Sequence, residues 1–394
     1  MNRAILSSEV QDFLRAHIDE QPADMALQKS PFPDVSAAEL ATQLDGLRRS
    51  RKKLPLWYAT PGIYFPALLS MEQSSSGTAA AYKSTLIPEH GSFIDLTGGF
   101  GVDSYYFSKR AKEGIHCEYQ ATLSAIAAHN ALQLQANNIH FIAGDGMAYL
   151  KNSNQSFDVI YIDPSRRVKQ QKVFRFSDCE PNVVDNLAFL LQQSGSIIIK
   201  AAPLLDIKAA LNELNYVKEV HIVSVQNECK ELLFILEPGY TGFPIYHCVA
   251  LQEKKEIQKL IFSDQMEADS HPIYSNPLHY LYEPDAALLK GGCFRSIATT
   301  FSLNKLHQHT HLYTSENLVP AFIGRTFEVI TTKSYADFKK DKKGLTANVS
   351  TRNFPLKPEE LKKRHRIKDG GNDYLFFCTG PNDELLVLLG RKLK

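Results

Sequence analysis

Paired cysteines, long apolar runs and a strong net charge are all missing from this sequence of 394 residues. Its six cysteines are scattered and none stands in a C-x-x-C pair, so neither a disulfide framework nor a zinc site is indicated. No apolar stretch approaches the length of a membrane span, and residues 1–10 hold no signal-peptide core. The sequence therefore predicts a protein of the reducing cytoplasm, with no metal ion and no membrane partner.

The net charge is close to zero, because 44 lysines and arginines stand against 43 aspartates and glutamates. Such a chain is not attracted to polyanions as a whole, so any nucleic-acid surface must be a local basic cluster. Hydrophobic residues make up 44% of the chain, which is enough for sizeable cores. The length exceeds that of one ordinary domain, and two or three are expected.

The stretch from residue 93 to residue 101 predicts a buried strand that runs into a glycine turn. Asp95 stands near the end of the strand, and a helix is expected from Val102, with Gly114 at its end. The turn lets the backbone approach a ligand closely, although a purely structural turn is the alternative. It consists of Thr97, Gly98, Gly99 and Gly101.

Further strands and helices alternate after this turn, as in an α/β fold with a mostly parallel sheet. The strand at 115–119 ends on Glu118, the strand at 140–143 is followed by Asp145, and the buried strand at 157–162 leads into Asp163. Strands at 220–225 and 232–236, separated by a short turn, predict an antiparallel hairpin at the end of the sheet. A carboxylate at the position of Glu118 can accept hydrogen bonds from both hydroxyls of a ribose.

This succession resembles the class I S-adenosylmethionine-dependent methyltransferases, which have a Rossmann-like, seven-stranded sheet. The resemblance implies that S-adenosylmethionine is the cofactor and that residues 85–238 form the catalytic domain. It also implies that Asp95 and the glycine turn hold the methionine end of the cofactor, Glu118 the ribose and Asp145 the adenine. The G-x-G-x-x-G spacing of NAD-binding proteins fits less well, and Asp103 at the helix start suits a cationic cofactor better than a pyrophosphate.

Amino-group methyltransferases place a D/N-P-P-aromatic motif after the fourth strand, and this chain has Asp163-Pro164-Ser165-Arg166. The acceptor Asp163 and Pro164 are present, whereas the second proline and the aromatic ring are not. Arg166 could stack on a base, bind a phosphate, or belong to a surface turn. The missing ring could come from Phe174 or Phe176. Arg167 and Lys200 are further candidates for substrate binding, although Lys200 could equally extend into solvent.

The segments on either side of the catalytic domain differ in character. Residues 1–84 predict helices, with a capping box at Ser36 and Glu39. The serine-rich stretch 73–77 could be a mobile loop or a lid over the cofactor pocket. His307, His309 and His311 would share one face of a strand, and we interpret them as an exposed face rather than a metal site.

The C-terminal part resembles two small α/β domains found in a group of bacterial methyltransferases. Residues 239–320 resemble a ferredoxin-like piece, and residues 321–394 resemble a THUMP-like domain through the sequence NVSTRNFP at 348–355 and the basic helix after it. THUMP domains bind structured RNA, so the resemblance implies an RNA partner. Basic residues of the helix could contact phosphates or could be ordinary solvated residues. They include Lys362, Lys363 and Arg366.

The sequence thus favours a cytoplasmic S-adenosylmethionine-dependent methyltransferase acting on a base nitrogen of structured RNA, either rRNA or tRNA. Two alternatives remain open. One is a methyltransferase for an amine of a protein or small molecule. The other is an RNA-binding protein with a vestigial methyltransferase fold, which the presence of Asp95, Glu118, Asp145 and Asp163 disfavours. No cysteine lies beside the Asp163 motif, so methylation of a pyrimidine C5 is disfavoured too.

Overall fold

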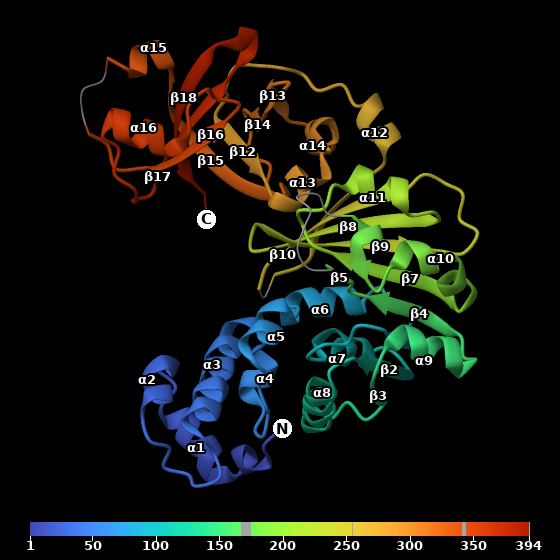
Figure 1. Cartoon of the computed structure of the whole chain (residues 1–394). Coiled ribbons are helices and arrows are strands. Elements are labelled where there is room, and N and C mark those ends of the chain that lie inside the picture. Colours follow the sequence, from blue (N-terminus) through green and yellow to red (C-terminus); the bar gives the residue numbers. More distant parts are fainter. Residues whose placement is uncertain (167–174, 254, 341–343, 394) are drawn as a thin grey trace. The chain divides into compact units, whose positions relative to one another are not determined.

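A computed structural model describes residues 1–166, 175–253, 255–340 and 344–393 (Figure 1). The chain forms two compact units, Met1–Glu219 with Leu232–Gly242 and Val220–Glu231 with Phe243–Lys394. The boundary passes through the hairpin of β8 (Val217–Val225) and β9 (Glu228–Leu236). The division into four segments stays a prediction. In the described residues, no helix is long and apolar enough to cross a membrane.

The first 84 residues are helical, as predicted. The expected capping box begins the longest of these helices, because the Ser36 hydroxyl accepts from the Glu39 amide and the Glu39 carboxylate accepts from the Ser36 amide. A buried cluster that includes Leu44, Trp57 and Phe93 packs these helices against the sheet of the first unit. The helices are η1 (Arg3–Leu6), α1 (Ser8–Ala16), α2 (Pro22–Leu27), α3 (Ala37–Lys53), α4 (Pro55–Ala59), α5 (Leu68–Gln73) and α6 (Gly77–Ser84).

The large sheet has the strand order β11-β10-β8-β9-β7-β4-β1-β2-β3. The pairs β1–β2, β1–β4, β2–β3 and β4–β7 are parallel, and β7–β9 is antiparallel, which confirms the expected methyltransferase-type sheet. Two more strands, β10 and β11, extend the predicted seven. The remaining bounds are β1 (Ser92–Asp95), β2 (Glu113–Glu118), β3 (Ile139–Ala143), β4 (Phe157–Ile162), β7 (Ser194–Ala201), β10 (Ile245–Leu251) and β11 (Gln258–Phe262).

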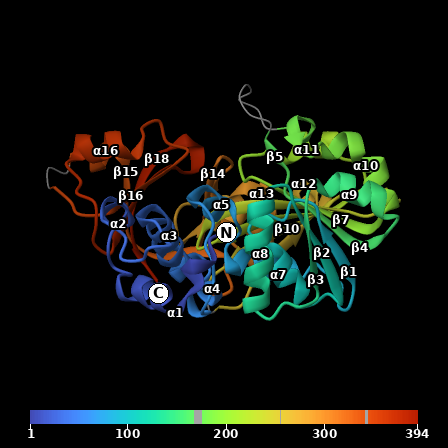
Figure 2. The ribbon, with the colours of Figure 1, turned by 60° about the horizontal axis from the view of Figure 1, so that its bottom comes forward.

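Helices connect the parallel strands of the first unit. In both views α7 and α8 lie beside β2 and β3 (Figure 2). β4 is buried at nearly every position, as a central parallel strand covered on both faces must be. The helices are α7 (Val102–Ser108), α8 (Ala121–Gln133), α9 (Gly146–Ser153), α10 (Val183–Gln192) and α11 (Ile207–Glu213), with the short η2 (Phe176–Asp178) and the strands β5 (Ser165–Arg166) and β6 (Cys179–Glu180) after β4.

The second unit contains a sheet of order β13-β14-β12-β15-β18-β17-β16. This sheet curls, because β14 and β16 contact each other although four strands separate them in the order. The Thr310 hydroxyl donates to the Thr379 carbonyl at 2.6 Å and helps hold the curl. The elements are α12 (Asp264–Asp269), β12 (Tyr280–Pro284), α13 (Ala286–Gly291), α14 (Phe294–Phe301), β13 (Asn304–His307), β14 (Thr310–Ser315), β15 (Gly324–Ser334), α15 (Tyr335–Phe338), β16 (Asn348–Arg352), α16 (Pro358–His365), β17 (Asp373–Thr379), η3 (Pro381–Asp383) and β18 (Leu385–Lys392).

Two local expectations were wrong. Gly114 does not end a helix: α7 stops at Ser108 and Gly114 lies in β2, where a Cβ atom would come within 2.1 Å of the Phe93 ring. The three histidines near residue 309 do not share a strand face, because β13 ends at His307 and β14 begins at Thr310, so the chain turns between them. In both cases contacts with a distant segment overrode the local pattern.

Candidate functional site

The acidic residues predicted for the site follow neighbouring parallel strands. Asp95 is the last residue of β1 and Glu118 the last of β2, while Asp145 follows β3 and Asp163 follows β4. Carboxyl ends of parallel strands lie at one edge of a sheet, which is where α/β proteins bind their ligands. The structure therefore brings these four predicted residues to the same edge.

The glycine turn lies directly against a buried histidine. A Cβ atom on Gly98 would come within 2.1 Å of the His116 ring, and the ring is fully buried in β2. Gly101 has a φ of +81°, a left-handed conformation that costs glycine little, and its amide donates to the Gly98 carbonyl at 2.9 Å. Side chains at these two positions would force the turn to move.

Glu118 connects the glycine turn to the end of β2. Its Oε2 accepts from the Gly99 amide at 2.9 Å and its Oε1 accepts from the Gln120 amide at 2.8 Å. The side chain stays half-exposed, so a ligand can still reach the carboxylate. Tyr119 next to it is 81% exposed and offers a flat ring at this edge, which the sequence analysis did not single out.

Asp145 is the N-cap residue of α9. One carboxylate oxygen, Oδ1, accepts from the amides of Met147 at 2.8 Å and Ala148 at 3.1 Å. The residue is exposed, and within the described part of the chain its Oδ2 accepts no hydrogen bond. That oxygen can accept from a donor group of a ligand.

Asp95 differs from the other acids because it is 1% exposed. Its Oδ1 accepts from the Thr97 amide at 3.0 Å, and its Oδ2 accepts from the Ser104 hydroxyl at 2.6 Å. Burial raises the pKa of Asp95 to about 7, although the hydrogen bonds from Ser104 and Thr97 act in the opposite direction. The carboxyl group thus holds the turn and the start of α7 together.

Asp163 is anchored next to the glycine turn. Its amide donates to the Thr97 hydroxyl at 2.7 Å, which joins the end of β4 to the end of β1. Its Oδ2 accepts from the ammonium group of Lys200, whose side chain is 13% exposed. Lys200 is therefore directed at the predicted acceptor rather than into solvent.

The other residues of the Asp163 motif are placed in part. Pro164 is buried, and the backbone of Arg166 pairs with Cys179 across β5 and β6. Arg167 and Phe174 lie outside the described residues. Phe176 cannot supply the missing ring at an open site, because it is fully buried and packs edge-on against Phe234.

A buried charged network next to the site was not expected from the sequence. Asp103, near the start of α7, accepts from the hydroxyls of Ser75 at 2.8 Å and Tyr161 at 2.9 Å, and its Oδ1 lies 3.2 Å from the Lys83 ammonium nitrogen. Burial alone would raise the pKa of Asp103, but the charges of Lys83 and Lys200 outweigh it and the pKa is lowered.

This network decides between the two interpretations of the serine-rich stretch. Ser74 ends α5 and Ser76 caps α6, while Ser75 is 7% exposed and accepts from Lys83 at 2.8 Å. The stretch is thus a packed connection between two helices, and the interpretation as a mobile loop or lid was wrong. No local signal distinguishes such an anchored serine from an exposed one.

The predicted RNA-contacting residues lie at the end of α16. Lys362 binds Asp369 at 2.9 Å and Glu359 at 3.3 Å, so two acids partly neutralise it. Lys363 and Arg366 are exposed. Of the earlier basic run, Lys342 and Lys343 fall outside the described residues, and Lys340 binds Asp337 at 2.7 Å.

The NVSTRNFP stretch uses its polar residues to hold the curled sheet. The guanidinium of Arg352 donates to Glu283 at 2.7 Å, and Arg325 also binds Glu283, which is 2% exposed. The Asn348 amide group donates to the Gly371 carbonyl at 3.0 Å. These residues join β16 to β12 and to the turn before β17.

Comparison with known proteins places the C-terminal half first. Residues 280–322 match a ferredoxin-like domain family, and residues 324–392 match a THUMP domain-like family. A crystal structure from Porphyromonas gingivalis W83, described as a candidate methyltransferase, is 33% identical to this chain with a TM-score of 0.87. The match covers 100% of this chain and 99% of that one. A search of the curated proteins gave no match.

Two further structures, solved in complex with S-adenosylhomocysteine, match only part of the chain. A candidate methyltransferase from Streptococcus mutans is 16% identical, covers 40% of this chain and 94% of its own, and has a TM-score of 0.30. TrmK from M. capricolum is 14% identical, covers 45% of this chain and 71% of its own, and has a TM-score of 0.32. These two likenesses are too low to support an inference about function. Since the Porphyromonas gingivalis structure matches from end to end, the chain belongs to the class I methyltransferases that carry a ferredoxin-like piece and a C-terminal THUMP-like domain.

Proposed function

We propose that this protein transfers the methyl group of S-adenosylmethionine to a base nitrogen of structured RNA, either rRNA or tRNA, in the cytoplasm. The observation that carries the proposal is the hydrogen bond from the Asp163 amide to the Thr97 hydroxyl at 2.7 Å. It holds an acceptor for an amine next to the turn that would bind the cofactor. The chemistry then depends mostly on proximity and orientation of the amine.

The residues at the sheet edge fit this cofactor. A Cβ atom on Gly99 would meet only the Thr97 carbonyl, at 3.9 Å, and one on Gly144 would meet nothing within 4 Å, so the backbone is open to a ligand at the ends of β1 and β3. Glu118 would accept from the ribose hydroxyls and Asp145 from the adenine amino group. Gly98, Gly99 and Gly101 with Thr97 would lie along the methionine end, behind which Asp95 supports the turn. The bound cofactor supplies an electrophilic methyl group.

Asp163 would orient the target amine. Its Oδ2 is bound by Lys200, while its Oδ1 accepts no hydrogen bond within the described part of the chain and can accept from an amine N–H. A new N–C bond forms as the S–C bond breaks, and the amine gives up one proton. The Lys200 charge favours the ionised form of Asp163, which is the form that accepts.

The RNA part of the proposal is supported by the THUMP domain-like match at 324–392 and by the exposed basic residues of α16. Arg166 and Arg167 beside Asp163 suit a substrate with phosphates or stacked bases. The alternatives are an amine of a protein or small molecule, and an RNA-binding protein without activity. The order in the site, with Asp163 held by both Thr97 and Lys200, disfavours the last.

Methyl transfer from labelled cofactor to RNA tests the proposal. The RNA comes from a strain that lacks this protein, and we expect label in one RNA species. Asp163→Ala should lower turnover by about 100-fold or more while cofactor affinity is nearly unchanged. Asp178→Ala changes an exposed acid after the motif and should behave like the wild type. If label appears only in protein or small molecules, the substrate is not RNA, and wild-type turnover of Asp163→Ala would rule out the amino-group mechanism.

A further inference from the structure

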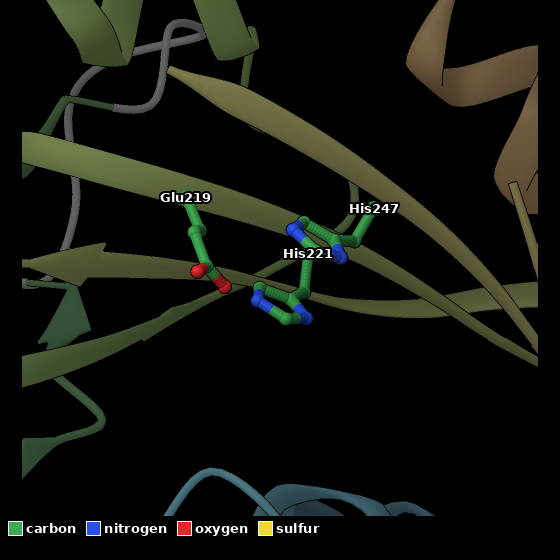
Figure 3. A group of neighbouring side chains, drawn as sticks. All are labelled: Glu219, His221 and His247. Carbon is green, nitrogen blue, oxygen red and sulfur yellow. The ribbon is translucent and has the colours of Figure 1, made fainter. Parts of the chain in front are cut away.

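Glu219, His221 and His247 form a cluster of metal-ligating type outside the methyltransferase site. A carboxylate oxygen and one nitrogen of each imidazole all lie within 4.8 Å of one another. Figure 3 shows the carboxylate of Glu219 and the two imidazole rings turned toward a common point. Within the described residues, this is the group of three or more such ligands that the structure brings together.

The strand arrangement accounts for the cluster. Glu219 and His221 are two residues apart on the continuous backbone of β8, so both side chains leave the same face of the sheet. β10 is the neighbour of β8 and contributes His247 on that face. The two imidazole rings stack in parallel, with centroids 4.3 Å apart and planes at 5°. The placement of the ligands is thus a local property of two adjacent strands.

Burial separates this cluster from an ordinary surface patch. His221 is 1% exposed and His247 is 9% exposed, whereas Glu219 is half-exposed. Two imidazoles fixed against each other lose little side-chain entropy when they bind an ion. The half-exposed carboxylate leaves a path from solvent, which a metal ion needs for entry.

We propose that Glu219, His221 and His247 bind one divalent transition-metal ion of the zinc type. Two imidazole nitrogens and one carboxylate oxygen suit Zn²⁺, Co²⁺ or Fe²⁺, and disfavour Mg²⁺ and Ca²⁺, which take oxygen ligands. In a tetrahedral zinc site with bonds of about 2.0–2.1 Å, donor atoms are about 3.3 Å apart. The cluster needs a modest contraction, which rotation of the Glu219 side chain can supply, and the fourth position remains for water.

The proposal differs from what cysteine spacing predicted, because no cysteine takes part. It also differs from the histidines considered in the sequence, which lie elsewhere. His307 binds Asp383 at 3.1 Å and has His309 beside it, with ring centroids 5.6 Å apart. That pair of rings is a second place where added metal could bind weakly, so the experiment must distinguish the two.

Titration of the metal-free, full-length protein with Co²⁺ tests the site, since the visible absorption of bound Co²⁺ reports its coordination. We expect one equivalent to bind, Zn²⁺ to displace it, and Zn²⁺ to raise the Tm by about 5 °C. Glu219→Gln and His247→Gln should each weaken binding by about tenfold or more. Glu228→Gln, on an exposed acid of β9, and His309→Asn should leave the affinity unchanged.

Binding that survives both Glu219→Gln and His247→Gln, or that is lost in His309→Asn, would overturn the proposal, as would the absence of stoichiometric binding. Glu219→Gln alone decides the question if His247→Gln fails to fold, because glutamine keeps the size of the half-exposed side chain and removes only its charge. Circular dichroism of each variant checks the fold.

Discussion

Asp95, Ser104 and His116 form a buried hydrogen-bonded chain beneath the glycine turn. Ser104 donates to Asp95, and its hydroxyl oxygen lies 3.0 Å from His116 Nδ1, which is therefore the donor. Burial lowers the pKa of His116 to about 3, so the ring is neutral. Its Nε2 is buried without a hydrogen-bond partner. The chain fixes the ring against which Gly98 packs.

Replacing Asp95 by asparagine should make stability depend on pH through His116. In the wild type between about pH 4 and 6.5, the folded pair holds one proton on Asp95, whose pKa is raised to about 7, while the unfolded pair holds one on His116. The numbers are equal, so the two groups add no slope. In Asp95→Asn the folded pair holds none, so the free energy of unfolding should fall by about 1.4 kcal/mol per pH unit as pH drops from 6.5 to 4.

The complementary variant His116→Gln should show the opposite slope. Its folded state keeps the Asp95 proton that the unfolded state has lost, so stability should fall as pH rises from about 4 to 7. Urea denaturation at several pH values measures both variants against the wild type. If all three proteins share one pH dependence, the two pKa values are not perturbed in this way.

Glu118 should be the residue that most affects cofactor affinity. Glu118→Ala removes the acceptor for the ribose hydroxyls and for the Gly99 amide, and each unpaired group costs about 1–3 kcal/mol. We expect S-adenosylmethionine to bind about tenfold more weakly or worse by calorimetry, and Glu118→Gln to fall in between. Glu113→Ala, on an exposed residue at the start of the same strand, is the control. Wild-type affinity in a folded Glu118→Ala protein would disprove this role.

At the scale of elements, Asp103 joins four segments that are separate in the sequence. It connects α7 with the stretch before α6 through Ser75, with α6 through Lys83, and with β4 through Tyr161. Lys83 is 0% exposed, so its charge depends on Asp103 for compensation. The helical N-terminal segment is thereby attached to the helix that follows the glycine turn.

Lys83→Met should destabilise the protein strongly, because it leaves Asp103 buried without its cation. Removal of one partner from a buried ion pair costs about 3–5 kcal/mol, measured by urea denaturation. Lys112→Met, on an exposed lysine, should change stability by only about 0.5 kcal/mol. The double variant Lys83→Met/Asp103→Asn should recover part of the loss. A double variant less stable than the single one would show that burial of charge is not the cause.

At the scale of the whole molecule, the near-neutral net charge makes the basic end of α16 stand out. Lys363, Arg364 and Arg366 are exposed there, whereas Lys362 already binds Asp369 and Glu359. The structure thus shifts attention from Lys362 to its neighbours as phosphate contacts. Each phosphate that they neutralise would release counterions, so RNA affinity should fall steeply with salt.

Charge reversal of Lys363, Arg364 and Arg366 should weaken RNA binding and reduce its salt dependence by up to about three charges. Lys362→Glu should have a smaller effect, and cofactor affinity should stay at the wild-type value in both variants. Binding assays at several salt concentrations measure the slope. If the triple variant binds RNA like the wild type at every concentration, the THUMP-like part is not the RNA anchor, and an amine of a protein or small molecule becomes the leading substrate.

The sequence by itself determined the elements and the chain positions of the site. The capping box of Ser36 and Glu39, the strand at Phe157–Ile162 and the acids at the ends of successive strands are local patterns, and they were predicted correctly. The family resemblance was confirmed over the full length. These features depend on neighbours a few residues apart, which is the range over which hydrophobic period and capping act.

Only the tertiary structure decided which side chains meet. Ser75 and Lys83 bind Asp103, His116 packs under Gly98, and His247 joins a cluster on β8, although each contact spans residues far apart in the chain. Phe176 was assigned to an open site and proved to be core. Burial depends on which segments the fold brings together, and a single sequence records each residue's type but not its distant neighbours.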